Sequence, residues 1–288
     1  MQRCRRPPAR QPLSEFPVRS HQAPRYSLHM EPATGGDETW IRVLTLNAHQ
    51  GMHAGRRHGA LLRIRNALRA SRADLVFLQE IGAAGRPEPN AHQYELLADG
   101  VWTQHAYGRN AVATGGHHGN ALLSRHPILT WRNVDASVGR AEPRGLLHAV
   151  IGLDGDREPL HAICLHLALR ESHRRRQVDR LLDLVVNEVP DGAPLVIAGD
   201  FNDWRQRAHR RLVLSGLQEV HAAAVGRPAR TFPARAPWLR LDRIYVRNVR
   251  HRPVKVSTRD WRMLSDHLPL AAELGVSAHP ENHGSSGS

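Results

Sequence analysis

The sequence predicts an α/β domain with more than one β-sheet. Along residues 38–275, short apolar runs alternate with segments in which apolar residues recur at helical spacing. The runs Leu146–Leu153 and Leu160–Leu167 flank the turn residues Asp154–Gly155, which predicts an antiparallel pair among the other strands. The 288 residues, of which 41% are hydrophobic and 23% are charged, are enough for one large globular domain or two small ones.

Each predicted strand is a short apolar run bounded by polar or turn residues, and each predicted helix has apolar residues three or four positions apart. In chain order we predict a strand at Trp40–Leu46, a helix through Leu61, Ile64 and Leu68, strands at Asp74–Leu78 and Asn120–Ser124, the antiparallel pair, a helix through Val178, Leu181, Leu182 and Val185, a strand at Leu195–Ala198, a helix at Gln206–Leu214, and strands at Leu241–Val246 and Leu268–Leu274. The two longer helices carry arginines on the face opposite to their apolar residues, as amphipathic helices do.

The two ends of the chain differ in composition from the rest. Residues 1–37 are rich in Pro, Arg, Ser and Gly without periodicity, which predicts a disordered basic tail, and residues 276–288 predict a flexible tail. No apolar run approaches the roughly 18–20 residues of a transmembrane helix, and the N-terminus lacks the apolar stretch of a secretory signal. Cys4 and Cys164 lie far apart, and Cys164 sits in an apolar run, so we expect a buried free thiol and a cytoplasmic protein.

The chain is strongly basic, with a formal net charge of +13 that lies mostly within residues 38–275. Such a charge attracts polyanions, namely nucleic acid or an anionic lipid surface, and a lipid partner would place the protein peripherally at the membrane. A solvated arginine-rich surface is the alternative explanation, since Lys255 is the only lysine and arginine replaces lysine almost everywhere.

The segment Pro194–Asp203 places polar side chains directly after a buried strand. Its apolar run ends at Gly199, and Asp200, Asn202 and Asp203 follow within four residues. Carboxylate and amide oxygens at a strand end suit a divalent cation or a phosphate. Taken alone, the segment is explained equally well as an Asp-rich turn that caps the next helix.

Further strand ends carry polar groups of the same kind, which favours a site over separate structural roles. They are Asn47 and His49, Gln79 and Glu80, His166, Asp242, and Ser265–Asp266–His267. Charges at half-buried strand ends are costly unless they are paired or bound to a metal. The oxygen ligands predict Mg²⁺ or Mn²⁺ rather than zinc, and leave the histidines for acid–base chemistry or phosphate contacts.

Seven short motifs follow one another in a recognisable order. They are Leu-Asn-Ala-His-Gln-Gly (46–51), Leu-Gln-Glu (78–80), Gly-Asn-Ala-Leu-Leu-Ser-Arg (119–125), His-Leu (166–167), Gly-Asp-Phe-Asn-Asp (199–203), Leu-Asp-Arg-Ile-Tyr-Val (241–246) and Ser-Asp-His-Leu-Pro (265–269). Together they resemble the endonuclease/exonuclease/phosphatase superfamily, which includes DNase I-like nucleases, inositol-polyphosphate 5-phosphatases and neutral sphingomyelinases. The resemblance spans Trp40 to Leu274 and implies a four-layer α/β sandwich, in which two packed β-sheets are flanked by helices and the site lies in a cleft at one end.

The resemblance also implies roles for individual residues. Glu80 would bind the metal, with Asn47 close by and Asp266 touching the metal or orienting its neighbour. Asp200 would position or deprotonate the attacking water. The remaining expected roles are phosphate contacts from Asn202, phosphoryl binding or protonation by His267 with Asp242 orienting it, a second active-site histidine at His166, and substrate contacts from Asn120 and Arg144.

The implied activity is Mg²⁺- or Mn²⁺-dependent hydrolysis of a phosphodiester by a monomer, with nucleic acid as the first substrate class. A phospholipid head group is the first alternative, for which Trp204, Trp238 and Trp261 would form an apolar rim. A phosphomonoesterase and a non-catalytic basic adaptor are the others. His49 stands where some nuclease branches carry Asp, which is closer to small bacterial members of unknown substrate and to the sphingomyelinase and lipid-remodelling branches.

Overall fold

The computed structural model describes residues 38–49, 57–84, 92–113, 116–139, 142–155 and 157–277, and the fold is given for these residues. The predicted tails at 1–37 and 276–288 lie outside them, except for Val276, which ends the last strand, and Ser277. The limits of the predicted domain, 38–275, therefore stay a prediction.

Two six-stranded mixed sheets form the centre of the fold. The first sheet has the order β11-β12-β1-β2-β4-β3 and the second sheet has the order β5-β6-β7-β8-β10-β9. The strands of the first sheet are β1 (Thr39–Asn47), β2 (Leu75–Ala84), β3 (Gln104–Ala113), β4 (Gly116–Ser124), β11 (Arg250–Val254) and β12 (Leu270–Val276). The strands of the second sheet are β5 (Ile128–Asp135), β6 (Gly145–Ile151), β7 (Leu160–His166), β8 (Leu195–Asp200), β9 (Gln218–Glu219) and β10 (Asp242–Arg247).

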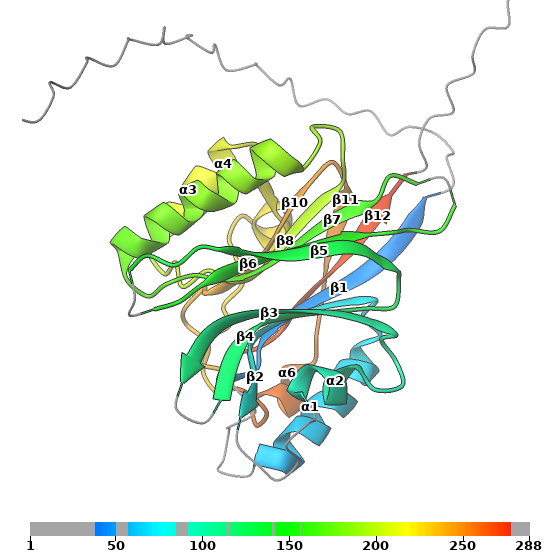
Figure 1. The fold of residues 1–288 in the computed structure, drawn as a ribbon, viewed down its shortest axis with the longest axis vertical. Helices are drawn as coiled ribbons and strands as arrows, with labels where there is room; N and C mark the ends of the chain where they lie inside the picture. The colour runs from blue at the N-terminus through cyan, green and yellow to red at the C-terminus, as the bar shows by residue number, and fades with distance from the viewer. Residues whose placement is uncertain are drawn as a thin grey trace, which may run out of the picture. The chain divides into compact units, whose positions relative to one another are not determined.

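Helices cover the outer faces of both sheets, so the layers are helix, sheet, sheet, helix (Figure 1). The helices α1 (Arg57–Ser71), α2 (Gln93–Ala98) and α6 (Thr258–Trp261) pack on the first sheet, and α3 (Glu171–Glu188) and α4 (Arg207–Leu214) pack on the second. A short helix, α5 (Val220–Val225), follows β9. This four-layer α/β sandwich confirms the predicted fold class. Among the described residues, no helix combines the length and the apolar character that crossing a membrane requires.

The alternation of side chains along the strands explains why two sheets pack together. In β8, Val196 and Ala198 point into the core between the sheets, whereas Leu195 and Ile197 point outward against α3 and α4. Because successive side chains of a strand point to opposite faces, a run that is apolar throughout must be covered on both sides. The helices supply the outer cover and the other sheet supplies the inner one.

A parallel strand pair lies inside each sheet and brings polar strand ends together. In the first sheet β1 and β2 are parallel with Asn47 paired to Gln79, and in the second sheet β7 and β8 are parallel with His166 paired to Asp200. The antiparallel neighbour β10 starts with Asp242 opposite Asp200. The C-terminal ends of β1, β2, β7 and β8 and the start of β10 therefore lie at one edge of the sandwich.

The strands absent from the sequence-based prediction are β3, β5, β9 and β11, which are the four edge strands. An edge strand is covered less completely and does not need a continuous apolar run. β5 is mostly exposed or half-buried, and β11 contains Pro253. The predicted antiparallel pair is confirmed as β6 and β7.

Candidate active site

Glu80 reaches the site because β2 is interrupted by a bulge between Leu78 and Ile81. The bulge places Glu80 in the left-handed region, at φ 55°, and turns its carboxylate toward the end of β1. There the Asn47 side-chain amide donates hydrogen bonds to Glu80 Oε1 and to Asp200 Oδ2, each at 3.2 Å. The amide of Asn47 thus joins a carboxylate of the first sheet to a carboxylate of the second.

The end of β8 is shaped by Gly199, which precedes Asp200. A Cβ atom at this position would lie 1.9 Å from the Leu165 carbonyl oxygen, and φ is 153°, so no side chain fits. The close approach of β7 and β8 keeps Asp200 buried and beside His166, whose Nε2 lies 3.4 Å from Asp200 Oδ2. Asp200 Oδ1 accepts a hydrogen bond from the backbone N–H of Asn202 at 2.9 Å, which fixes the carboxylate.

Asn202 also has left-handed backbone, with φ 48°, and its side chain turns back toward β7. The amide nitrogen donates to the Leu167 carbonyl at 2.9 Å and contacts His166 Nε2 at 3.1 Å. Among the described residues, six non-glycine residues have positive φ, and three of them, His49, Glu80 and Asn202, belong to this cluster. Such conformations cost on the order of 1–3 kcal/mol each and concentrate at functional sites.

His267 lies in the loop before β12 and is held by three contacts. Its Nδ1 is 2.8 Å from Asp242 Oδ2, and its Nε2 is 3.8 Å from Asp200 Oδ2. The Phe232 ring packs against the imidazole with a centroid distance of 4.9 Å. Ser265 supports the loop, since its hydroxyl donates to the Asn47 carbonyl at 2.6 Å and accepts the His267 N–H at 3.2 Å.

The two histidines are held in opposite protonation states. Burial lowers the pKa of His166 to about 3, with Arg144 and His267 acting in the same direction and Asp200 against it. Burial also disfavours the His267 cation, but the carboxylates of Asp242, Asp200 and Asp266 outweigh it and raise the pKa of His267 to about 10. The site therefore combines a neutral imidazole with a charged one at neutral pH.

Two groups of side chains could hold a metal ion. Asp200, Asp242 and His267 are buried and offer ligand atoms that all lie within 4.8 Å of one another. The second group comprises Glu80 and Asp266, which flank the partly exposed His49, with distances of 3.6 and 3.5 Å from its Nδ1 to Oε2 and Oδ2. The second group offers hard oxygen ligands only, as Mg²⁺ prefers, whereas in the first group the His267 Nδ1 already contacts Asp242.

The structure brings most of the predicted site residues into one cluster. Asn47, Glu80, His166, Asp200, Asn202, Asp242, Asp266 and His267 are linked by the contacts above. Asn120 is fully buried and donates to the carbonyls of Gly145 and Cys164 at 3.0 and 3.4 Å. Arg144 lies near His166 and pairs with Glu142 at 2.8 Å. Their substrate-binding roles stay predictions.

Asp203, which the sequence analysis groups with Asp200 and Asn202, is a structural residue of this region. It is fully buried, and its carboxylate accepts a hydrogen bond from Arg243 Nη1 at 3.0 Å and lies 3.9 Å from Arg174 Nε. It also accepts the backbone N–H groups of Arg207 and His209, both at 2.9 Å, at the start of α4. One carboxylate therefore ties α3, α4 and β10 together behind Asp200 and Asn202. Its position at the end of the Gly-Asp-Phe-Asn-Asp motif is the signal that could have revealed it.

Two packed mixed sheets with a buried cluster of acidic groups and histidine at one edge define a DNase I-like fold. The chain belongs to the Endonuclease/Exonuclease/phosphatase family, whose profile matches residues 44–267, and members of this family are generally metal-dependent phosphoesterases. It is 49% identical over 243 residues to a protein of Escherichia coli (strain K12) described as uncharacterized protein YbhP, which covers 81% of this chain and 96% of YbhP.

Solved structures share the fold at low sequence identity. The catalytic domain of human Nocturnin, solved with a bound sulfate anion, has a TM-score of 0.67 at 17% identity, covering 83% of this chain and 98% of that one. An endonuclease/exonuclease/phosphatase from Beutenbergia cavernae has a TM-score of 0.64 at 21% identity, covering 83% of this chain and 72% of that one.

Proposed function

We propose that the protein hydrolyses a phosphodiester with the help of Mg²⁺ or Mn²⁺, and that its substrate is a nucleic acid. The observation that carries this proposal is the surroundings of Asp200. Its Oδ2 is faced by Asn47 Nδ2 at 3.2 Å, His166 Nε2 at 3.4 Å and His267 Nε2 at 3.8 Å. A buried carboxylate with converging nitrogen groups suits the positioning of a water next to a phosphoryl group.

Glu80 and Asp266 are the residues that we assign to the metal, with Asn47 holding Glu80 in place. Both carboxylates contact the partly exposed His49 imidazole, and Asn47 joins Glu80 to Asp200. When bound, a divalent cation polarises a phosphoryl oxygen and lowers the pKa of a bound water. The Asp200, Asp242 and His267 group then serves proton transfer and charge stabilisation.

The chemical roles follow from the protonation states. Asp200, fixed by the Asn202 backbone, accepts the proton of the attacking water. His267, a cation at neutral pH, neutralises the charge that develops on the phosphoryl oxygens, and Asp242 keeps it charged. The Asn202 amide and the neutral His166 lie beside them for contacts with the scissile phosphate.

A phospholipid head group is the second candidate substrate, and the observation that favours it is the exposure of two tryptophans near the site. Trp238 is 63% exposed and Trp204 is 42% exposed, whereas Trp261 is buried and belongs to the core of the first sheet. The exposed Trp204 and Trp238 therefore support the predicted rim, and the buried Trp261 does not. We place the protein in the cytoplasm because Cys164 is a buried free thiol, and a lipid substrate would bring it to a membrane surface.

The test is hydrolysis of bis(4-nitrophenyl) phosphate with Mg²⁺, Mn²⁺ or EDTA, followed by assays on plasmid, single-stranded RNA and phospholipid vesicles. We expect activity that requires the metal and falls by about 10²–10⁴-fold in D200N, because a general base contributes that much. D183N, at an exposed aspartate of α3, is the matched control and keeps full activity. Metal-independent turnover, or a fully active D200N variant, would contradict the proposal.

A further inference from the structure

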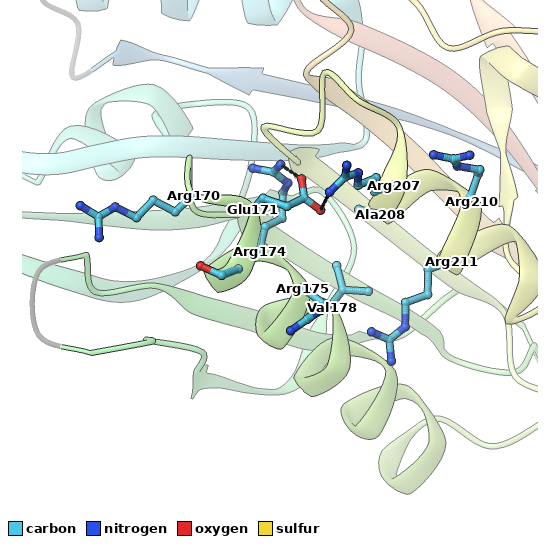
Figure 2. A pocket seen from close by; sticks show the side chains of 10 residues that line it. Arg170, Glu171, Arg174, Arg175, Val178, Arg207, Ala208, Arg210 and Arg211 are labelled. Atoms are coloured by element: carbon cyan, nitrogen blue, oxygen red, sulfur yellow. Dashed lines mark hydrogen bonds and ion pairs between the residues drawn. The ribbon is translucent and has the colours of Figure 1, made fainter.

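Six arginines line a groove between the first turns of α3 and α4, on the outer side of the second sheet. They are Arg170, Arg174 and Arg175 from the α3 side and Arg207, Arg210 and Arg211 from α4 (Figure 2). The groove, which we call the α3–α4 groove, has a volume of about 840 Å³. Glu171 is the one acidic side chain in its lining.

The positive charge of the groove is only partly neutralised. Glu171 pairs with Arg174 at 2.5 Å and with Arg207 at 3.8 Å, and Arg211 pairs with Asp179. Within the described part of the chain, the guanidinium groups of Arg170, Arg175 and Arg210 form no hydrogen bond or ion pair. Figure 2 shows Arg170 and Arg210 on opposite sides of Glu171. These cations are free to contact an external anion.

The walls of the groove are joined to the candidate active site. Asn202 donates to the Leu167 carbonyl at 2.9 Å, and the next two carbonyls, of Ala168 and Leu169, each accept a hydrogen bond from Arg174 at 2.9 Å. On the other wall, Asp203 holds the start of α4. The walls of the groove are therefore hydrogen-bonded to the loops that follow His166 and Asp200.

The chemistry of the lining favours a linear polyanion over a membrane. The apolar residues of the lining, Val178 and Ala208, are buried beneath the arginines, so the walls offer charge and no apolar side chain for insertion into lipid. A membrane surface is planar, so it would contact the rims of the α3–α4 groove and not its walls. Residues 171–178 of α3 extend over about 12 Å at about 1.5 Å per residue, which matches about three to four nucleotides of a stacked strand at about 3.4 Å each.

An exposed aromatic ring stands beside these arginines. Trp204 is 42% exposed, and the guanidinium of the buried Arg174 lies 5.0 Å from the centroid of its ring. Arginine and aromatic side chains together are the usual surface for a nucleic-acid strand, because phosphates contact the cations and bases stack on the rings.

We propose that the α3–α4 groove binds the phosphate backbone of one strand of a nucleic acid and holds it next to the candidate active site. This inference rests on the proposed phosphodiesterase function, for which it supplies the substrate class. Its contacts are with phosphates, so it binds without strong sequence preference.

The test is the binding of a fluorescein-labelled single-stranded oligonucleotide and of its duplex, measured by fluorescence anisotropy in EDTA, where no metal-dependent hydrolysis occurs. The variant R175Q/R210Q removes two arginines that have no structural partner, and R176Q/R259Q removes two exposed arginines outside the groove. Each lost phosphate contact lowers affinity about fivefold near 0.1 M salt, so we expect a loss of about 25-fold for the groove variant. We expect the slope of log affinity against log salt to decrease by about 1.4 for the single strand.

Several results would overturn the inference. These are equal weakening by the two double variants, unchanged binding by R175Q/R210Q, no binding by the wild-type protein, or groove-dependent binding to phosphatidylglycerol vesicles and not to the oligonucleotide. Hydrolysis of bis(4-nitrophenyl) phosphate with Mg²⁺ is measured in parallel, and both double variants should match the wild type. If groove-dependent binding is found without any diester hydrolysis, the groove assignment stands and the proposed hydrolysis fails.

Discussion

The substitution D242N tests how the site keeps His267 charged. Asp242 Oδ2 lies 2.8 Å from His267 Nδ1, and both side chains are buried. Two unit charges at that distance attract by about 6 kcal/mol at an effective dielectric constant of about 20. This attraction outweighs the burial of the imidazole and is the main reason that the pKa of His267 is raised to about 10. An asparagine keeps the shape and removes the charge.

In D242N we expect the pKa of His267 to fall to near its ordinary value of about 6.5, because burial then opposes the remaining carboxylates of Asp200 and Asp266. About one tenth of the imidazole would still be charged at pH 7.5, so turnover there should drop by about tenfold. Activity should recover as the pH is lowered toward 6. The assays are an NMR titration of His267 and the pH dependence of diester hydrolysis. An unchanged pKa in the variant would refute the reasoning.

The free energy of unfolding provides an independent test of the Asp242–His267 pair. A histidine whose pKa is higher in the folded state stabilises the fold fully below the unfolded value, about 6.5, and this contribution is lost as the pH rises through about 10. D242N should therefore be less stable than the wild type by about 3 kcal/mol near pH 6, and the difference should shrink as the pH approaches 10. Urea unfolding at both pH values measures it. A difference that does not depend on pH would mean that the pair is not charged.

Three further predictions follow from the described contacts. Because Glu80 is assigned to the metal, we expect the affinity for Mn²⁺, measured by calorimetry, to fall at least tenfold in E80Q and much less in D242N. A larger loss in D242N than in E80Q would assign the metal to Asp200, Asp242 and His267 instead. D203N should lower the free energy of urea unfolding by about 3–5 kcal/mol, because it leaves Arg243 buried without its carboxylate, and a loss below 1 kcal/mol would contradict the role of Asp203 as the link. Burial lowers the pKa of His148 to about 4, so as the pH drops His148 is protonated in the unfolded chain before it is protonated in the folded protein. The free energy of unfolding should therefore fall by up to about 3 kcal/mol as the pH drops from about 6.5 toward 4. In H148Q the urea midpoint should depend less on pH over this range.

The central strands and the polar positions at their ends are predictable from the sequence, because buried strands need apolar runs and the charged residues that interrupt them stand out. Leu195–Ala198 and its neighbour Asp200 are of this kind. The edge strands lack that requirement, and β5 mixes polar and apolar residues, most of which are exposed. Their pairing is set by the neighbouring strand and not by their own composition.

The contacts within the site are harder to predict than its members. Asn47 and Asp200 are separated by 153 positions in the chain, and only the packing of the two sheets brings their side chains to 3.2 Å. The contacts of Asp203 are not predictable from the sequence for a similar reason. Its partners Arg174 and Arg243 resemble every other arginine in a chain with 40 basic residues, and only their burial distinguishes them.

Because Asn47 and Glu80 lie on one sheet and His166 and Asp200 on the other, the core between the sheets sets the geometry of the candidate active site. The thickness of that layer, filled by side chains such as Val196 and Ile244, sets the separation of the two halves. A shift of one sheet against the other by a fraction of an ångström lengthens the bond from Asn47 to Asp200 before it breaks any strand pairing. Turnover is therefore expected to respond to conservative core substitutions that leave the folded state populated, and selection on activity acts on residues that never meet the substrate.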